Sequence, residues 1–153
     1  MDKREVRFDY TVYRNSFPEE YRELCEKAIQ VTGQSYSIYS GFSVGAAVLL
    51  DNGQVVVGAN QENVAYPSGL CAERTALFYA GATYPDCSVQ AIAIAACHKG
   101  ALTENFTPPC GACRQVMAEV IKRYGRDFDV LMIGQKETVQ LKASALLPFS
   151  FDF

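Results

Sequence analysis

The chain has 153 residues, 49% of them hydrophobic, which is enough to bury the core of a single domain over residues 1–153. Its 14 basic and 17 acidic residues are mixed along the chain, and the net charge of -3 disfavours a nucleic-acid partner. No apolar run approaches the roughly 20 residues that cross a membrane, and residues 1–5 lack the apolar centre of a signal peptide. We therefore expect a cytoplasmic protein with no membrane partner.

The 6 cysteines could belong to a disulfide-stapled secreted chain. Without a signal peptide, a reducing compartment is the better assumption. The thiols are then expected to be metal ligands, nucleophiles or plain core residues.

The first 33 residues predict one helix. Residues 1–15 carry mixed charge, and the sequence leaves open whether they add an edge strand or form a loosely packed extension. A helix is expected from Ser16, a candidate cap, to a stop at Gly33, because apolar residues recur there every three or four positions. Cys25 lies in this apolar stripe, so we predict a buried core thiol.

The middle of the chain predicts a β-hairpin and a buried strand. Residues 42–50 and 54–60 have the composition of strands, and Asp51-Asn52-Gly53 between them is a hairpin signal. Residues 89–97 are almost entirely Ala, Ile and Val, which is typical of a central strand that is covered on both faces.

Two more helices are expected over residues 71–81 and 110–124, and Gly125 is a typical residue to end the second. Short strands and a final helical turn follow, at residues 130–133, 138–141 and 143–147. This order predicts an α/β protein with three α/β/α layers, a mixed five-stranded sheet and helices on both faces. In such sheets ligands bind at strand ends, where helix N-termini also point.

Three cysteines have the spacing of a metal site at the starts of these two helices. Cys110 and Cys113 are three residues apart, which puts both sulfurs on one face of a helix, within reach of one ion. Cys71, at the start of the other helix, can supply a third thiolate, and the positive ends of both helices favour the anionic form. Three protein ligands leave the fourth position of a tetrahedral zinc ion to water, whose pKa zinc lowers to about 7.

Glu73 is the candidate for general acid-base catalysis, because it is two residues from a predicted ligand and can take a proton from that water. Arg74 could donate hydrogen bonds to the thiolates and offset their negative charge, although a solvated helix arginine is equally consistent with the sequence. His98, the single histidine, follows a strand beside Lys99 and Gly100 and is expected at the surface.

Other readings of the cysteines are open at this point. A C-x-x-C motif alone also marks structural zinc knuckles and redox pairs, and a closed four-thiolate site with Cys87 or Cys97 is conceivable. The complete pattern favours a catalytic site: Cys-Ala-Glu at one helix start, a buried strand, then Pro-Cys-x-x-Cys at the next helix start. Cys87 and Cys97 are then expected to be incidental thiols.

The pattern resembles that of zinc nucleobase deaminases, and with cysteine as the first ligand it more closely resembles the cytidine deaminases of free nucleosides. The similarity extends from about residue 36 to residue 151. It rests on YSGFSVGAA at 39–47, NQENVAYP at 60–67, CAERTA at 71–76, PCGACRQ at 109–115 and LLP at 146–148. The resemblance implies the cytidine deaminase-like fold and one zinc ion per subunit.

The resemblance also implies where a nucleoside binds. Phe42 would line the pyrimidine site, Asn60 and Glu62 would hold the ribose hydroxyls, and the backbone around Ala72 would bind the base carbonyl. An amide can donate to a hydroxyl and a carboxylate can accept from one, so a site with both rejects a ligand that lacks the hydroxyls.

Family members similar to this chain are homotetramers with shared active sites. The resemblance implies that Val64, Tyr66 and a C-terminal phenylalanine, here Phe151, complete the site of a neighbouring subunit. The chain departs from the family pattern between its two cysteine motifs, where residues 99–108 are expected to form an additional loop.

Residues and resemblance together predict hydrolytic deamination of cytidine and 2′-deoxycytidine to the uridine products, with release of ammonia. One alternative is a deaminase of another aminopyrimidine nucleoside such as blasticidin S, but Asn60 and Glu62 favour ordinary nucleosides. A structural zinc module that binds nucleic acid would need a basic face and a fourth protein ligand, and the sequence shows neither clearly.

Overall fold

One sheet of seven strands runs through the centre of the computed structural model, which describes residues 1–153. Its order is β1-β7-β6-β4-β2-β3, and the short β5 pairs with β4. Only β4 and β6 are parallel, and all other neighbours are antiparallel. The strands are β1 Tyr10–Arg14, β2 Phe42–Leu50, β3 Val55–Ala59, β4 Val89–His98, β5 Ala101–Leu102, β6 Asp129–Ile133 and β7 Glu137–Lys142.

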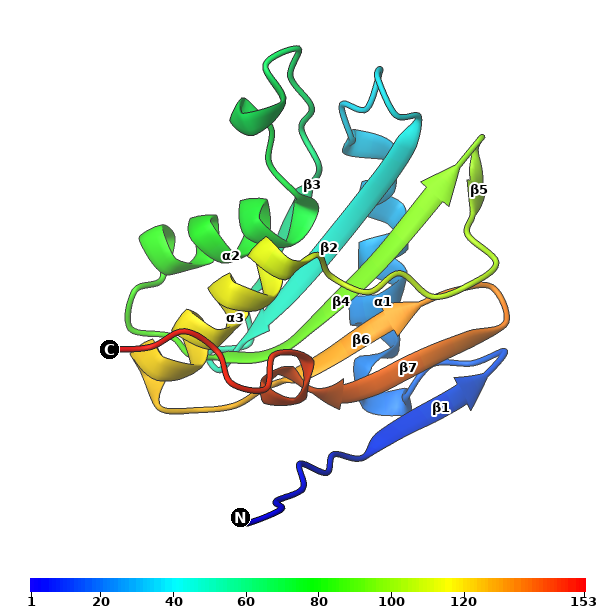
Figure 1. Ribbon diagram of the computed structural model, residues 1–153. Coiled ribbons are helices and arrows are strands. Elements are labelled where there is room, and N and C mark those ends of the chain that lie inside the picture. Colours follow the sequence, from blue (N-terminus) through cyan, green and yellow to red (C-terminus); the bar gives the residue numbers. More distant parts are fainter.

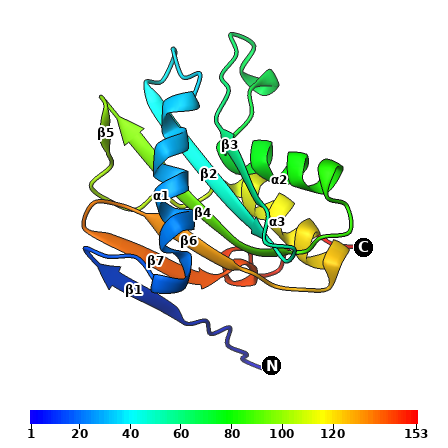
Figure 2. The ribbon, with the colours of Figure 1, turned by 180° about the vertical axis from the view of Figure 1, so that it is seen from behind.

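Helices cover both faces of this sheet. Helix α1 (Arg22–Val31) packs on β2 and β4 from one side, while α2 (Ala72–Thr83) and α3 (Gly111–Tyr124) lie on the other side (Figures 1 and 2). Buried apolar side chains form two clusters, one on each face of the sheet. The predicted three-layer α/β/α arrangement of a mixed sheet is therefore confirmed.

Strand β4 is the central strand that its composition predicted. Ile92 and Ile94 point into the cluster beneath α2 and α3, and the intervening alanines point toward α1. Because successive side chains of a strand face opposite ways, small residues on one face allow α1 to lie close to the sheet. All residues from 91 to 96 are fully buried.

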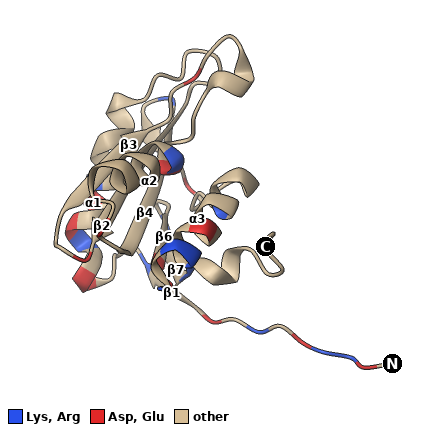
Figure 3. Cartoon of the chain, turned by 90° about the vertical axis from the view of Figure 1, so that its left-hand side faces the viewer, with Lys and Arg blue, Asp and Glu red and all other residues tan.

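The prediction of five strands was wrong, because two further strands pair at the margins of the sheet. β1 pairs with β7 along its full length and so adds an edge strand to the sheet. The N-terminal segment that precedes β1 extends away from the body (Figure 3). β5 lies within the predicted additional loop and pairs with the end of β4. Both strands are short and partly exposed, so their sequences carry little of the periodicity by which strands are recognised.

The boundaries of the helices follow the sequence except at the first one. α1 begins at Arg22, after a 3₁₀ turn at Glu19–Tyr21, and Ser16 caps neither. α3 ends at Gly125, whose φ of 64° is the left-handed conformation expected after a helix. Cys25 is fully buried, as predicted, and burial raises the pKa of its thiol to about 12.

The distribution of charged residues in the structure and the hydropathy of its helices agree with the expectations from composition. Basic and acidic residues are interspersed over the elements and do not gather on one of them (Figure 3). None of the helices has both the length and the apolar character needed to span a bilayer.

Gly58 in β3 allows the first turn of α2 to lie against the sheet. A Cβ atom at this position would lie 2.7 Å from the carbonyl oxygen of Ala72 and 2.7 Å from the backbone nitrogen of Ala76. Both atoms belong to helix backbone, so they cannot move without moving the helix.

We expect Gly58→Ala to lower the free energy of unfolding by about 3 kcal/mol, because the added methyl group forces α2 away from the sheet. Chemical denaturation measures this change. Gly33→Ala is the control, since nothing lies within 4 Å of a Cβ there. Equal stability of the two variants would contradict this account of the packing.

Candidate active site

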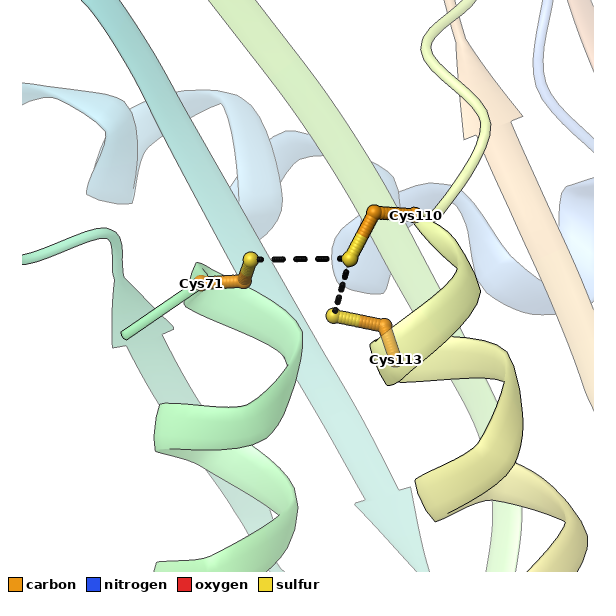
Figure 4. Close-up of side chains that lie close together, drawn as sticks. All are labelled: Cys71, Cys110 and Cys113. Atoms are coloured by element: carbon orange, nitrogen blue, oxygen red, sulfur yellow. Dashed lines mark hydrogen bonds between the residues drawn. The ribbon is translucent and has the colours of Figure 1, made fainter. Parts of the chain in front are cut away.

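Helices α2 and α3 begin beside each other and bring three cysteines together (Figure 4). Cys71 and Cys110 occupy the positions just before the first turns, both with extended backbone, and Cys113 lies in the first turn of α3. The Sγ atoms of Cys71 and Cys110 are 3.8 Å apart, and those of Cys110 and Cys113 are 3.5 Å apart. All three sulfurs lie within 4.8 Å of one another.

This donor set fits zinc. A tetrahedral zinc ion with Zn–S bonds of about 2.3 Å holds its sulfurs about 3.8 Å apart, close to the separations found here. Cys87 and Cys97 lie outside the cluster, and Cys97 Sγ instead accepts a hydrogen bond from Thr32 Oγ1 at 3.4 Å. Three thiols converge, as a catalytic zinc site requires, and a closed set of four does not form.

The surroundings favour the thiolate form of Cys71, the form that binds metal. The pKa of Cys71 is lowered to about 5, chiefly by a hydrogen bond from the Cys113 thiol and then by hydrogen bonds from Arg74 and Cys110, against the effect of burial. The same contacts raise the pKa of Cys113, since the first negative charge of the group resides on Cys71. The positive ends of the two helices act in the same direction.

Glu73 is the only buried carboxylate of the chain, and its side chain faces the thiol cluster. Its Oε2 accepts a hydrogen bond from Cys113 Sγ at 3.6 Å, and the residue is 4% exposed. Burial raises the pKa of Glu73, and the negative charge on Cys71 adds to the effect. A buried carboxyl group with a raised pKa, in contact with a predicted metal ligand, is a candidate for proton transfer.

Arg74 contacts the cluster rather than solvent alone. Its Nη2 donates to Cys71 Sγ at 3.4 Å, which is the arrangement that one of the two sequence readings predicted. Its Nε is buried without a partner. A fixed cation at this distance stabilises negative charge on the sulfurs.

A cavity of about 290 Å³ opens beside Cys71 and Arg74. Asn60 and Glu62 line it, and so do Tyr39 and Tyr66, which makes it a polar hollow with aromatic walls. A cavity of this size lies near the small end of the range for ligand pockets. The structure thus brings the predicted sugar-binding side chains next to the predicted metal ligands.

Two other predicted substrate contacts, Phe42 and Ala72, do not line this cavity. Phe42 is half-buried at the start of β2, and its ring centroid lies 6.4 Å from that of His98. Ala72 is fully buried in the first turn of α2. His98 is exposed, as predicted.

Three predicted residues are largely exposed, although Tyr66 also lines the cavity. Val64 is 77% exposed, and Tyr66 and Phe151 are each 75% exposed. Apolar side chains exposed to this extent make few contacts within the chain itself. They are available to a second molecule.

Two residues that hold the site were not predicted from the sequence. The Ser35 hydroxyl donates to Asn60 Oδ1 at 2.5 Å, and the Tyr39 amide donates to Glu62 Oε1 at 3.0 Å. Both belong to the loop that precedes β2, which is rich in Ser and Tyr. Contacts between this loop and residues about 25 positions later carry no local sequence signal.

Comparison with known proteins decides the family. The sequence model of the cytidine and deoxycytidylate deaminase zinc-binding region matches residues 18–124. The chain belongs to this deaminase family. Strand β1 precedes the matched region, whereas the three cysteines, Glu73 and the cavity residues lie within it.

Individual relatives agree with this assignment. A cytidine deaminase of Halalkalibacterium halodurans is 43% identical over 129 residues, which cover 84% of this chain and 91% of that protein. A probable cytidine deaminase of Dictyostelium discoideum is 35% identical over 135 residues, covering 87% of this chain and 85% of that protein.

Solved structures show the same fold. The crystal structure of cytidine deaminase from Burkholderia pseudomallei superposes with a TM-score of 0.69 at 33% identity and covers 88% of this chain and 100% of that one. Cytidine deaminase from Mycobacterium tuberculosis gives a TM-score of 0.69 at 31% identity, with 89% and 100% coverage. The predicted family, fold class and zinc cofactor are thereby confirmed, and the chain is a zinc-dependent hydrolytic deaminase.

We expect Cys110→Ala to lose stoichiometric zinc, because two thiols bind the ion far more weakly than three. Metal analysis of the purified proteins measures the zinc content per chain. Cys87→Ala is the matched control, since Cys87 lies outside the cluster and should leave the zinc content unchanged. Full zinc content in Cys110→Ala would exclude this ligand set.

Proposed function

We propose that this chain converts cytidine and 2′-deoxycytidine to uridine and 2′-deoxyuridine, with release of ammonia. The observation that carries the proposal is the convergence of three thiols and the buried carboxylate of Glu73 at two adjacent helix starts. The adjoining cavity with Asn60 and Glu62 supports a nucleoside as the substrate. The cytidine deaminases among its relatives support the same substrate.

Cys71, Cys110 and Cys113 would hold one zinc ion per subunit. When bound, zinc supplies Lewis acidity that lowers the pKa of a water molecule to near neutrality. Arg74 offsets part of the negative charge of the three thiolates through its contact with Cys71. This contact helps to keep Cys71 in the thiolate form that metal binding requires.

Glu73 would move the protons of the reaction. Its carboxylate takes a proton from the attacking water and delivers it to N3 of the base, which prepares C4 for attack. It then takes the second proton of that water, from the hydroxyl group now on C4, and delivers it to the amino group, which leaves as ammonia while the C4 carbonyl forms. Burial raises the pKa of Glu73 above its ordinary value, which makes its protonated form easier to reach than that of an exposed carboxylate.

Substrate recognition would use the cavity and its margin. Phe42 would contact the pyrimidine ring, and the backbone at Ala72 would bind the base carbonyl. Asn60 and Glu62 would bind the sugar hydroxyls. The carboxylate of Glu62 is held ionised, because hydrogen bonds from Ser40 and Tyr39 outweigh the effect of burial and lower its pKa.

The active form would be a homotetramer with shared sites. Val64, Tyr66 and Phe151 are exposed apolar side chains that a neighbouring subunit would cover. The last residues lie along α3, where Gln115 Nε2 donates to the carbonyl of Phe151 at 3.2 Å and Lys122 pairs with Asp152. These contacts hold the backbone of the tail and leave the Phe151 ring free to enter a neighbouring site.

We expect Glu73→Ala to fold and bind zinc but to lose about 10²- to 10⁴-fold in kcat, the usual contribution of a general acid-base group. The decrease in cytidine absorbance measures turnover, and metal analysis confirms that zinc is retained. Glu26→Ala, which removes an exposed carboxylate from α1, should be as active as the unchanged protein. Near-normal turnover by zinc-loaded Glu73→Ala would refute the proton-transfer role.

Deleting residues 149–153 should reduce both assembly and activity while the subunit remains folded, because the tail lies outside the buried core. Light scattering after size-exclusion chromatography gives the assembly state, and initial rates give the activity. Deletion of residues 1–5, which are also exposed, serves as the control. A fully active tetramer without the tail would show that Phe151 is not part of any site.

A further inference from the structure

Backbone groups fix the orientation of the Asn60 side-chain amide. The Val44 amide donates to Asn60 Oδ1 at 2.8 Å, and Asn60 Nδ2 donates to the carbonyl of Phe42 at 2.9 Å. A backbone N–H can only donate and a backbone carbonyl can only accept, so the positions of the amide oxygen and nitrogen are unambiguous. The start of β2 therefore sets which atoms of Asn60 can meet a ligand.

Ser35 completes the hydrogen bonding of the amide oxygen. Its hydroxyl donates to Asn60 Oδ1 at 2.5 Å, the second donor to that atom. An amide oxygen accepts about two hydrogen bonds, one per lone pair, so none remains for a ligand. Nδ2 still has one hydrogen, because Phe42 uses only the other. Toward the cavity Asn60 is thus a donor only.

Glu62 presents the opposite character. Its Oε1 accepts from the amides of Tyr39 at 3.0 Å and Ser40 at 3.1 Å, while Oε2 has no partner within the chain. Oε2 is therefore a free acceptor in the cavity that Asn60 also lines. A hydroxyl group is both donor and acceptor, so it can satisfy both side chains, whereas a hydrogen or an ether oxygen in its place cannot.

We propose that Ser35 is a positioning residue for sugar recognition: its hydroxyl locks the Asn60 amide, already oriented by the backbone, and fills the second acceptor site of its oxygen, so that Asn60 offers only an N–H and the site is selective for nucleosides with a free sugar hydroxyl. The proposal rests on the proposed function in one respect, that the ligand is a nucleoside. Ser35 does not contact the ligand itself. It acts through Asn60.

The position of Ser35 does not depend on its hydroxyl. Its amide donates to the carbonyl of Thr32 at 3.2 Å, and the next amide, that of Tyr36, donates to the carbonyl of Asn60 at 3.0 Å. The carbonyl of Tyr36 in turn accepts from the Glu62 amide at 2.8 Å. Removal of the hydroxyl therefore leaves the backbone of the loop in place, and Ser35→Ala isolates the single contact with Asn60.

The test measures binding of uridine and 2′,3′-dideoxyuridine to the zinc-loaded protein by calorimetry. Ser35→Ala should weaken uridine binding about 3- to 10-fold, the range expected for one lost hydrogen bond, and should leave dideoxyuridine binding unchanged. Ser35→Thr keeps the hydroxyl and should restore the preference for uridine. Ser37→Ala is the matched control, because the Ser37 hydroxyl contacts Ser43, 2.9 Å away, and not Asn60.

Steady-state kinetics on cytidine and 2′,3′-dideoxycytidine provide the second readout. Ser35→Ala should raise KM for cytidine with kcat nearly unchanged, so that selectivity for the hydroxylated substrate falls. If Ser35→Ala loses the same affinity for the hydroxylated and the dideoxy ligand, the role of Ser35 is merely structural. If its uridine binding is unchanged, Ser35 has no role in recognition. Either result overturns the proposal, as does a protein that binds uridine and dideoxyuridine equally well.

The two proposals fail in different ways. Preferential binding of uridine without turnover of cytidine would refute the proposed function and leave the role of Ser35 standing. If the protein deaminates cytidine but Ser35→Ala and Ser37→Ala bind both ligands equally well, the proposed function stands and the role of Ser35 is refuted.

Discussion

The site depends on two helices that begin at the same end of the sheet. β3 and β4 are each antiparallel to β2, so they run in the same direction, and β4 is parallel to β6. Strands that run in the same direction cannot be joined by a tight turn, and here a helix lies in each connection: α2 between β3 and β4, and α3 between β4 and β6. Both helices therefore start where β3 and β4 end. This topology brings Cys71 to Cys110, which is 39 positions later in the sequence.

The same arrangement solves an electrostatic problem. Three thiolates and a carboxylate at close range would repel one another, and burial would add to the cost. Helix N-termini, Arg74 and the metal supply the opposing positive charge. Glu73 is the most buried of the acidic groups, and burial raises its pKa by disfavouring the charged carboxylate. This raised pKa makes Glu73 suitable for proton transfer.

The residues for catalysis and those for substrate recognition lie on different kinds of secondary structure. The zinc-binding and proton-carrying residues begin helices packed on the sheet, and Gly58 permits the close contact that positions one of them. Asn60 and Glu62 lie in a loop, yet backbone amides and the Ser35 hydroxyl hold each of them in one orientation. Selectivity for a sugar hydroxyl follows from which hydrogen-bonding atoms those contacts leave free.

Local sequence patterns were sufficient to predict much of the fold and the metal site. Strand composition and turn residues predicted β2 and its hairpin, and helical spacing predicted α3. The Cys and Glu motifs at two expected helix starts predicted a metal site. Each of these signals lies in residues near in sequence. Only the tertiary structure determined which segments distant in sequence contact one another. It paired β1 with β7, turned Arg74 toward Cys71 and placed Ser35 against Asn60. A serine in a loop or an arginine on a helix has many possible partners, and only the packed chain selects one.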